Sequence, residues 1–177
     1  RGGIPSRKAW PQNIEAFALF AKDKPNARYF LHTDIAADGY EQGVNIPLIA
    51  AQLGISDKLL FCDQERYRRG GFPEEYLRAF YCAINVLNAV SLGEGFGIPQ
   101  LEAQACHTPV IVSEFAAARD LCFSGWSIKD GIRFYDSQAA WTFVPKPEAI
   151  ADAMQDAYTI LPVQGKDFFH FMAQERV

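Results

Sequence analysis

The chain has 177 residues, of which 49% are hydrophobic, and a formal net charge of −4. This length and apolar content allow one proper hydrophobic core, so we expect a single main domain. The acidic balance argues against a general surface for nucleic acids or anionic membranes, because such partners are usually met by a basic field.

Amphipathic helices and short apolar strands alternate along the first two thirds of the chain. Apolar residues repeat at helical spacing in three segments, at residues 14–21, 46–53 and 77–84. Apolar runs of strand length lie at residues 27–32, 58–62, 84–91 and 109–113. This alternation predicts βαβ units, and therefore an α/β fold with a doubly wound parallel sheet. Such sheets bind ligands outside the carboxyl ends of their strands.

The pattern is looser after residue 113. A short helical turn is expected over residues 114–119, and an edge strand over residues 132–135. Apolar residues over 150–161 indicate an amphipathic helix. The aromatic-rich segment at residues 168–172 predicts one more helix at the end of the chain.

The four cysteines and three histidines are too scattered for a metal or redox centre. A zinc site or a CxxC motif requires close pairs, which are missing here. The cysteines are therefore expected to be reduced core thiols, which indicates a cytoplasmic protein. We find no signal peptide and no transmembrane segment in the sequence, which agrees with a cytoplasmic location. Attachment to the surface of a membrane stays open as an alternative. The one basic cluster, residues 66–71, is expected to form a solvated loop.

Glu94 and Glu102 lie in a glycine-rich segment, with seven residues between them. The predicted strand at 84–91 runs directly into glycines, which permit backbone angles that other residues avoid. Pro99 is best tolerated in a first helical turn, so it predicts a helix over residues 98–106. The two carboxylates therefore flank the start of one helix.

A helix start of this kind has a definite ligand preference. Its free backbone amides and the positive end of the helix dipole attract a phosphate. Carboxylates are poor phosphate ligands but good acceptors for sugar hydroxyls. A diphosphate flanked by two hydroxylated rings fits the arrangement. The alternative is an ordinary strand-to-helix turn whose glutamate is favoured by the dipole alone.

A downstream segment, residues 103–113, extends this pattern, and the two segments together closely resemble the donor core of one enzyme family. The family is that of the retaining GT-B glycosyltransferases of the family 4 type, also called glycosyl transferases group 1. The matching residues are Ser91, Glu94, Gly95, Phe96, Gly97, Pro99, Glu102, Ala103, Ala105, Cys106, Thr108, Pro109, Val110 and Ile111. The resemblance implies a Rossmann-like half of a GT-B fold, with a donor-binding domain over residues 1–163 and a C-terminal helical tail over 164–177. It also implies a glycosyltransferase of the hexosyltransferase type, which binds a nucleotide diphosphate sugar and transfers the sugar with retention of configuration.

The resemblance assigns roles to individual residues. In the family an Arg and a Lys ahead of the first helix hold the donor diphosphate, and Arg7 and Lys8 stand at that place. Glu94 would contact the transferred sugar, and Glu102 the ribose. Fixed cations aimed at the diphosphate stabilise the negative charge left when the sugar–phosphate bond breaks. The expected catalytic residues are Arg7, Lys8 and Glu94, and the expected donor-binding residues are Glu94, Gly95, Phe96, Gly97, Ile98 and Glu102.

Further expectations concern the metal, the base and two neighbouring residues. The sequence lacks an acidic metal motif such as Asp-x-Asp, so we expect metal-independent transfer without any cofactor. The nucleotide base would lie near residues 63–66. Asp120 stands where the family often has a further Glu, or is simply a charge at a helix end, and the two interpretations are weighted equally. His107 replaces a family Gly and is expected to be an exposed loop residue.

In the family the acceptor site and several catalytic contacts lie in an N-terminal domain that this chain does not contain. We therefore expect the isolated chain to bind nucleotide sugar weakly and to transfer it poorly or not at all. Two alternatives stay open. One is a non-catalytic or regulatory nucleotide-sugar binding module, and the other is a different GT-B enzyme, such as a nucleotide-sugar epimerase or a phosphorylase.

Overall fold

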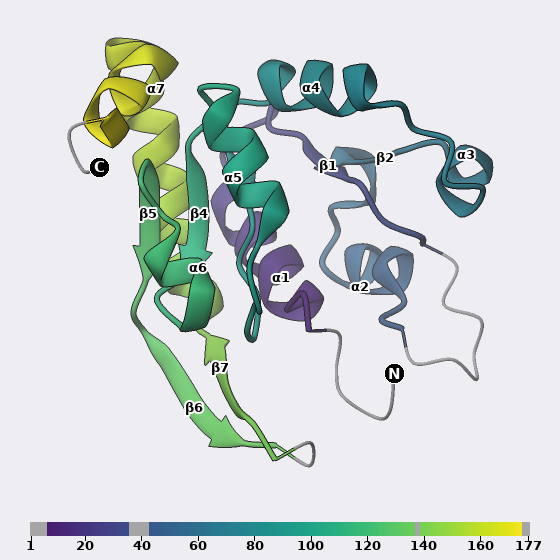
Figure 1. The fold of residues 1–177 in the computed structure, drawn as a ribbon. Coiled ribbons are helices and arrows are strands. Elements are labelled where there is room, and N and C mark those ends of the chain that lie inside the picture. The colour runs from purple at the N-terminus through teal and green to yellow at the C-terminus, as the bar shows by residue number, and fades with distance from the viewer. Residues whose placement is uncertain (1–6, 36–42, 137–138, 175–177) are drawn as a thin grey trace.

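The computed structural model of the chain describes residues 7–35, 43–136 and 139–174, with side chains up to residue 166 (Figure 1). Helices and parallel strands alternate along the chain, so the expected α/β fold is confirmed. The first half contains α1 (Trp10–Ala21), β1 (Tyr29–Leu31), α2 (Ile46–Gln52), the 3₁₀ turn η1 (Ser56–Lys58), β2 (Leu59–Phe61), α3 (Gln64–Arg68), α4 (Glu74–Ala83) and β3 (Leu87–Asn88). The second half contains α5 (Ile98–Ala105), β4 (Val110–Ser113), α6 (Ala116–Asp120), β5 (Gly125–Ile128), β6 (Gly131–Tyr135), β7 (Trp141–Pro145) and α7 (Pro147–Gln174).

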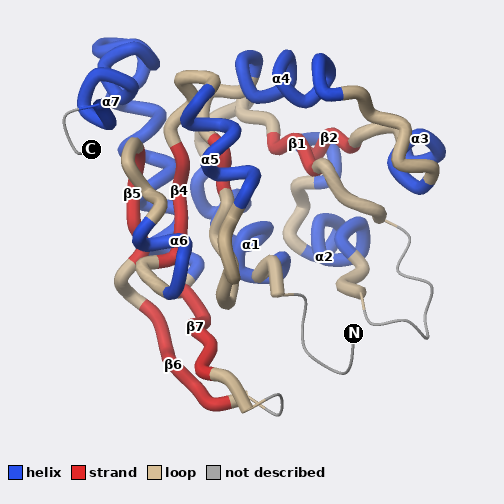
Figure 2. The backbone as a smooth tube through the Cα atoms, viewed as in Figure 1, coloured by secondary structure: helices blue, strands red, loops and turns tan. Residues whose placement is uncertain are grey.

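The strands form two parallel sheets and one hairpin (Figure 2). β1 pairs with β2 in the first sheet, and the second has the order β3-β4-β5. β6 and β7 form an antiparallel hairpin that extends away from the rest of the domain. Among the described residues no strand joins β1 to β3, so the parallel sheet lies in two pieces.

β4 is the buried centre of the fold, and its two faces pack against different helices. Because successive side chains of a strand point to opposite faces, Ile111 and Val112 belong to different clusters. Ile111 packs with buried residues of α1 and α7, such as Ile14 and Ile150. Val110 and Val112 pack with residues of α4, α5 and α6. Helices thus cover both faces, as a doubly wound sheet requires.

The predictions from the sequence did not include β5 and β7, and two smaller predictions were wrong in part. Residues 64–68 form α3, so the expected loop at 66–71 is partly helical. None of the four cysteines is in a disulfide, but Cys82 is exposed, so the core assignment is wrong for that thiol. Residues 168–172 continue α7 beyond a kink at Gly165, which has φ 71° and ψ 171°. The division of the chain at residue 163 stays a prediction.

Asn13 fastens α1 and the residues before it to the end of β3. Its buried side-chain amide donates to the carbonyls of Lys8 (2.9 Å) and Val90 (3.0 Å). Its Oδ1 accepts from Nδ2 of Asn88 (3.0 Å), which also donates to the Tyr29 hydroxyl (3.0 Å). One buried side chain therefore fixes the backbone of Lys8 relative to the carboxyl end of β3.

Replacement of Asn13 by alanine should be costly, because it leaves buried polar partners unsatisfied. We expect Asn13→Ala to lower the free energy of unfolding by about 2–3 kcal/mol. The matched control is Asn26→Ala, at an exposed position ahead of β1, which should change it by less than about 0.5 kcal/mol. Urea denaturation of both variants measures the difference, and equal effects would contradict the role given to Asn13.

Candidate functional site

The first turn of α5 has the geometry that the glycine pattern predicts. α5 begins at Ile98, with Pro99 in its first turn, and Gly97 caps it in the left-handed region at φ 91° and ψ 51°. A Cβ at Gly97 would lie 2.8 Å from Cδ of Gln100, whose buried side chain fills this space. Only glycine suits this position, because the backbone angle and the space both exclude a side chain. In the described part of the chain, no side chain caps the free amides at this helix start.

The helix start is open to solvent. Gly95 is exposed, and the residues Phe96 and Ile98 are each 59% exposed. The uncapped amides, the dipole and the exposure together make this turn a suitable site for an anion.

Arg7 and Lys8 converge with Glu94 beside this turn, although 86 residues separate Lys8 from Glu94. Nζ of Lys8 lies 2.5 Å from Oε1 of Glu94, and Nη1 of Arg7 lies 3.4 Å from Oε2 of the same carboxylate. The Glu94 side chain is 9% exposed, whereas those of Arg7 and Lys8 are 60% and 45% exposed. Two accessible cations therefore flank one shielded carboxylate, and one positive charge is left over.

The backbone that carries these cations is fixed at both residues. The carbonyl of Arg7 accepts a hydrogen bond from the amide of Leu92 (2.8 Å), just beyond the carboxyl end of β3. The carbonyl of Lys8 accepts from Asn13 (2.9 Å). The side chains of Arg7 and Lys8 therefore extend from backbone that is held by hydrogen bonds, while their charged ends remain accessible. Groups that bind a ligand need both properties.

Glu102 lies about one turn into α5, where its carboxylate is held by Tyr81 of α4. The Tyr81 hydroxyl donates to Oε2 of Glu102 (3.0 Å), and the Tyr81 carbonyl accepts from the hydroxyl of Thr108 (2.6 Å). Burial, and then the neighbouring Glu102, raise the pKa of the Tyr81 hydroxyl, in keeping with its role as the donor in this bond. From the sequence, Tyr81 was placed only on the apolar face of the helix expected over residues 77–84. The helical spacing of apolar residues predicts that its ring is buried, but it does not predict the hydrogen-bond partner of its hydroxyl.

Ser91 is a second polar group in the site whose environment the sequence does not reveal. It is fully buried at the end of the strand before the glycine turn. Its carbonyl accepts from Oγ of Ser113 (2.5 Å), but its own Oγ has no partner among the described residues. Because this hydroxyl is fully enclosed, it does not face a ligand at the helix start.

The loop expected to hold the base has a distinct shape. An open surface hollow of about 310 Å³ is lined by Asp63, Glu65, Arg66, Arg69 and Gly71. Asp63 caps α3, because its Oδ1 accepts from the amide of Arg66 (2.9 Å). A hollow therefore lies where the sequence places the base, although the base assignment itself stays a prediction.

Two neighbouring residues can now be placed. Asp120 is the last residue of α6, and its Oδ1 lies 2.7 Å from Nε of Arg119, which lowers the pKa of the Asp120 carboxyl. This geometry favours the helix-end interpretation of Asp120. His107 is exposed, as expected, and its φ of 60° explains why the family prefers Gly there.

Two kinds of feature are absent from the described residues. No group of three or more His, Cys, Asp or Glu side chains there could hold a metal ion. Nor does that part of the chain contain a helix of the length and apolarity needed to cross a membrane.

Similar sequences carry glycosyltransferase names. D-inositol 3-phosphate glycosyltransferase of Geodermatophilus obscurus is 31% identical over 135 residues, which cover 74% of this chain and 27% of that protein. The enzyme of the same name from Streptomyces bingchenggensis is 41% identical over 117 residues, or 64% of this chain and 24% of that protein. The chain thus spans only about a quarter of the length of these curated relatives.

Solved structures support the fold. Sucrose-phosphate synthase from Thermosynechococcus elongatus matches 96% of this chain and 38% of its own, with a TM-score of 0.68 and 21% identity. The C-terminal domain of a glycosyl transferase group 1 family protein (LpcC) from Francisella tularensis matches 98% of this chain and 81% of its own, with a TM-score of 0.65 and 17% identity. The expected Rossmann-like half of a GT-B fold is therefore confirmed. Residues 2–159 match the family model described as glycosyl transferases group 1, and the chain belongs to this family of glycosyltransferases.

Proposed function

We propose that this chain is the donor-binding domain of a glycosyltransferase and that it binds a nucleoside diphosphate sugar at the start of α5. The observation that carries this proposal is the convergence of Arg7 and Lys8 with Glu94 beside the uncapped helix start. A diphosphate placed there would meet two cations and several free amides. These groups would also stabilise the charge that develops when the sugar–phosphate bond breaks.

Glu94 is the proposed contact to the transferred sugar. In the structure its carboxylate is paired with Lys8 and Arg7. A bound diphosphate would compete for both cations and leave the carboxylate to accept hydrogen bonds from sugar hydroxyls. The ion pairs would thus hold the three side chains in place until the donor arrives.

Glu102 is the proposed contact to the ribose, and Tyr81 positions it. A carboxylate has several lone-pair sites, so Oε2 can accept from Tyr81 while Oε1 accepts from a ribose hydroxyl. Gly95, Phe96, Gly97 and Ile98 belong to the proposed donor site through their backbone, because their exposed turn leads into the helix.

Transfer without a metal and with retention of configuration completes the proposal. Arg7, Lys8 and the helix dipole supply positive charge at the position where a divalent cation would otherwise act. Retention rests on the family resemblance. The acceptor site is assigned to the part of the relatives that this chain does not span.

Calorimetric titration with UDP, GDP, ADP and their sugars tests donor binding. At least one nucleotide should bind, and Glu102→Ala should weaken binding about tenfold or more, because a charged hydrogen-bond acceptor is lost. Glu15→Ala on the exposed side of α1 is the matched control and should have no effect. Failure of every nucleotide to bind would contradict the donor site, whereas binding unaffected by Glu102→Ala would contradict only the ribose assignment.

Glu94→Gln separates the sugar contact from the diphosphate contact. The variant removes a negative charge next to Arg7 and Lys8, so the free nucleoside diphosphate should bind as tightly as before or more tightly. The preference for the nucleotide sugar over the free diphosphate should fall about tenfold, because the neutral amide is a weaker acceptor for hydroxyls. The same titrations measure both affinities, and an unchanged preference would rule out Glu94 as the sugar contact.

A further inference from the structure

Two of the four cysteines lie side by side in the fold, although they are far apart in the sequence. Cys82 lies near the end of α4, and Cys106 follows the last residue of α5. The thiol of Cys106 makes a side-chain hydrogen bond with that of Cys82. Neither residue is in a disulfide, and Cys82 is exposed whereas Cys106 is half-buried. The pair is therefore a dithiol that a reagent in solution can reach.

Independent contacts hold the ends of α4 and α5 in this arrangement. The amide of Cys106 bonds to the carbonyl of Glu102 (3.1 Å), so the two side chains lie one turn apart on the same face of α5. That face meets α4, because the hydroxyl of Tyr81 donates to Glu102 (3.0 Å). The carbonyl of Tyr81 accepts from the hydroxyl of Thr108 (2.6 Å), just beyond Cys106. Hydrogen bonds therefore lie on both sides of the two thiols.

Lys166 of α7 fastens both partners of the dithiol. Its Nζ donates to the carbonyl of Cys82 (2.9 Å) and to that of Ile84. The same Nζ lies 3.4 Å from Oγ1 of Thr108, two residues after Cys106. One ammonium group therefore joins the backbone of Cys82 to the turn that carries Cys106.

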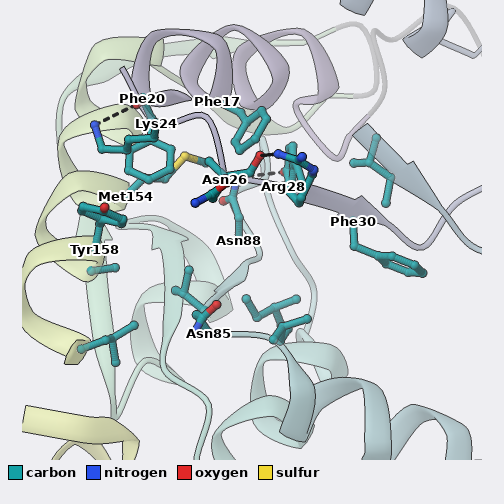
Figure 3. Close-up of a pocket in the computed structure, with 18 of the residues that line it drawn as sticks. Phe17, Phe20, Lys24, Asn26, Arg28, Phe30, Asn85, Asn88, Met154 and Tyr158 are labelled. Carbon is teal, nitrogen blue, oxygen red and sulfur yellow. Dashed lines mark hydrogen bonds between the residues drawn. The ribbon is translucent and has the colours of Figure 1, made fainter. Parts of the chain in front are cut away.

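The other side of α4 packs less closely. Leu77 and Phe80 line a cavity of about 720 Å³, together with Phe30, Asn85 and Asn88 (Figure 3). Residues that border a cavity lose part of their packing contacts. The contacts with α5 are therefore important for holding α4, and a covalent link between the two helices would strengthen them.

The different environments of the two thiols set the order in which they react. The thiolate is the nucleophile in an exchange with a disulfide. Burial, and then the neighbouring Cys82, raise the pKa of the Cys106 thiol, which lowers its thiolate fraction. Cys82 is exposed, so a reagent meets it first.

We infer that Cys82 and Cys106 form a site of reversible oxidation, at which a low-molecular-weight disulfide converts the two thiols into a bond between α4 and α5. The Cys82 thiolate attacks one sulfur of the reagent and displaces a thiolate, which leaves a mixed disulfide on Cys82. The Cys106 thiolate then attacks the Cys82 sulfur and displaces the second thiolate. The two cysteines lose two electrons and two protons, and the reagent is reduced to two thiols.

Oxidised glutathione is the probe, and mass spectrometry after thiol labelling in denaturant is the readout. In the wild-type chain the number of labelled thiols should fall from four to two, with a peptide link between Cys82 and Cys106. Cys106→Ser removes the second nucleophile, so the mixed disulfide on Cys82 should persist about tenfold longer or more. Cys122→Ser is the matched control and should still lose two thiols.

Oxidation should also stabilise the chain, because the link restricts the unfolded state. We expect the midpoint of thermal unfolding of the wild type to rise by roughly 5 °C or more, and that of Cys106→Ser to change by less than about 2 °C. All of these measurements are made without nucleotide, so their outcome is independent of the proposed donor binding.

Three results would overturn the inference. The first is that all four wild-type thiols remain free, or that glutathione stays on Cys82 equally long in the wild type and in Cys106→Ser. The second is a link from Cys82 to Cys122 or to a second copy of the chain. The third is a lower unfolding midpoint in the oxidised wild type, which would mean that the thiols cannot be joined without strain. The peptide map of the wild type decides the matter even if Cys106→Ser does not fold.

Discussion

The site depends on the hydrogen bonds that hold the backbone of Arg7 and Lys8 against the end of β3. Leu92 bonds to the Arg7 carbonyl, and Asn13 bonds to the carbonyls of Lys8 and Val90. These contacts join the segment before α1 to the glycine turn before α5. Without them, Arg7 and Lys8 would be ordinary charges on a flexible segment, and the entropy of ordering them would have to be supplied by the ligand.

The electrostatics of the site follow from this fixed backbone. A shielded carboxylate, Glu94, sits between two accessible cations, and an uncapped helix start lies beside them. The cations remain available because a partly exposed ion pair is weak and can be exchanged for a better partner. A diphosphate is such a partner, since it offers more charge and more acceptor oxygens than one carboxylate. The Tyr81 hydroxyl donates a hydrogen bond to Glu102, and Lys8 and Arg7 form ion pairs with Glu94. Both carboxylates therefore have defined positions.

Local chemistry made much of this arrangement predictable from the sequence. Gly97 and Pro99 each demand a particular backbone, so the start of α5 could be placed to the residue. β5 was missed because its sequence, Gly-Trp-Ser-Ile, has no apolar run and forms a strand only through its pairing with β4. Gly125 permits that pairing, because a Cβ there would lie 1.9 Å from the Val110 carbonyl oxygen. The Tyr81–Glu102 bond is likewise a product of tertiary packing, which periodicity does not report.

The central claim is that a diphosphate binds at the start of α5, and the backbone amides there report it most directly. NMR spectra recorded during titration with UDP, GDP and ADP would show which amides respond. The account predicts that the amides of Phe96, Gly97 and Ile98 shift most strongly with whichever nucleotide binds. Saturable binding that leaves these three amides unmoved, while only amides of residues 63–71 shift, would contradict it.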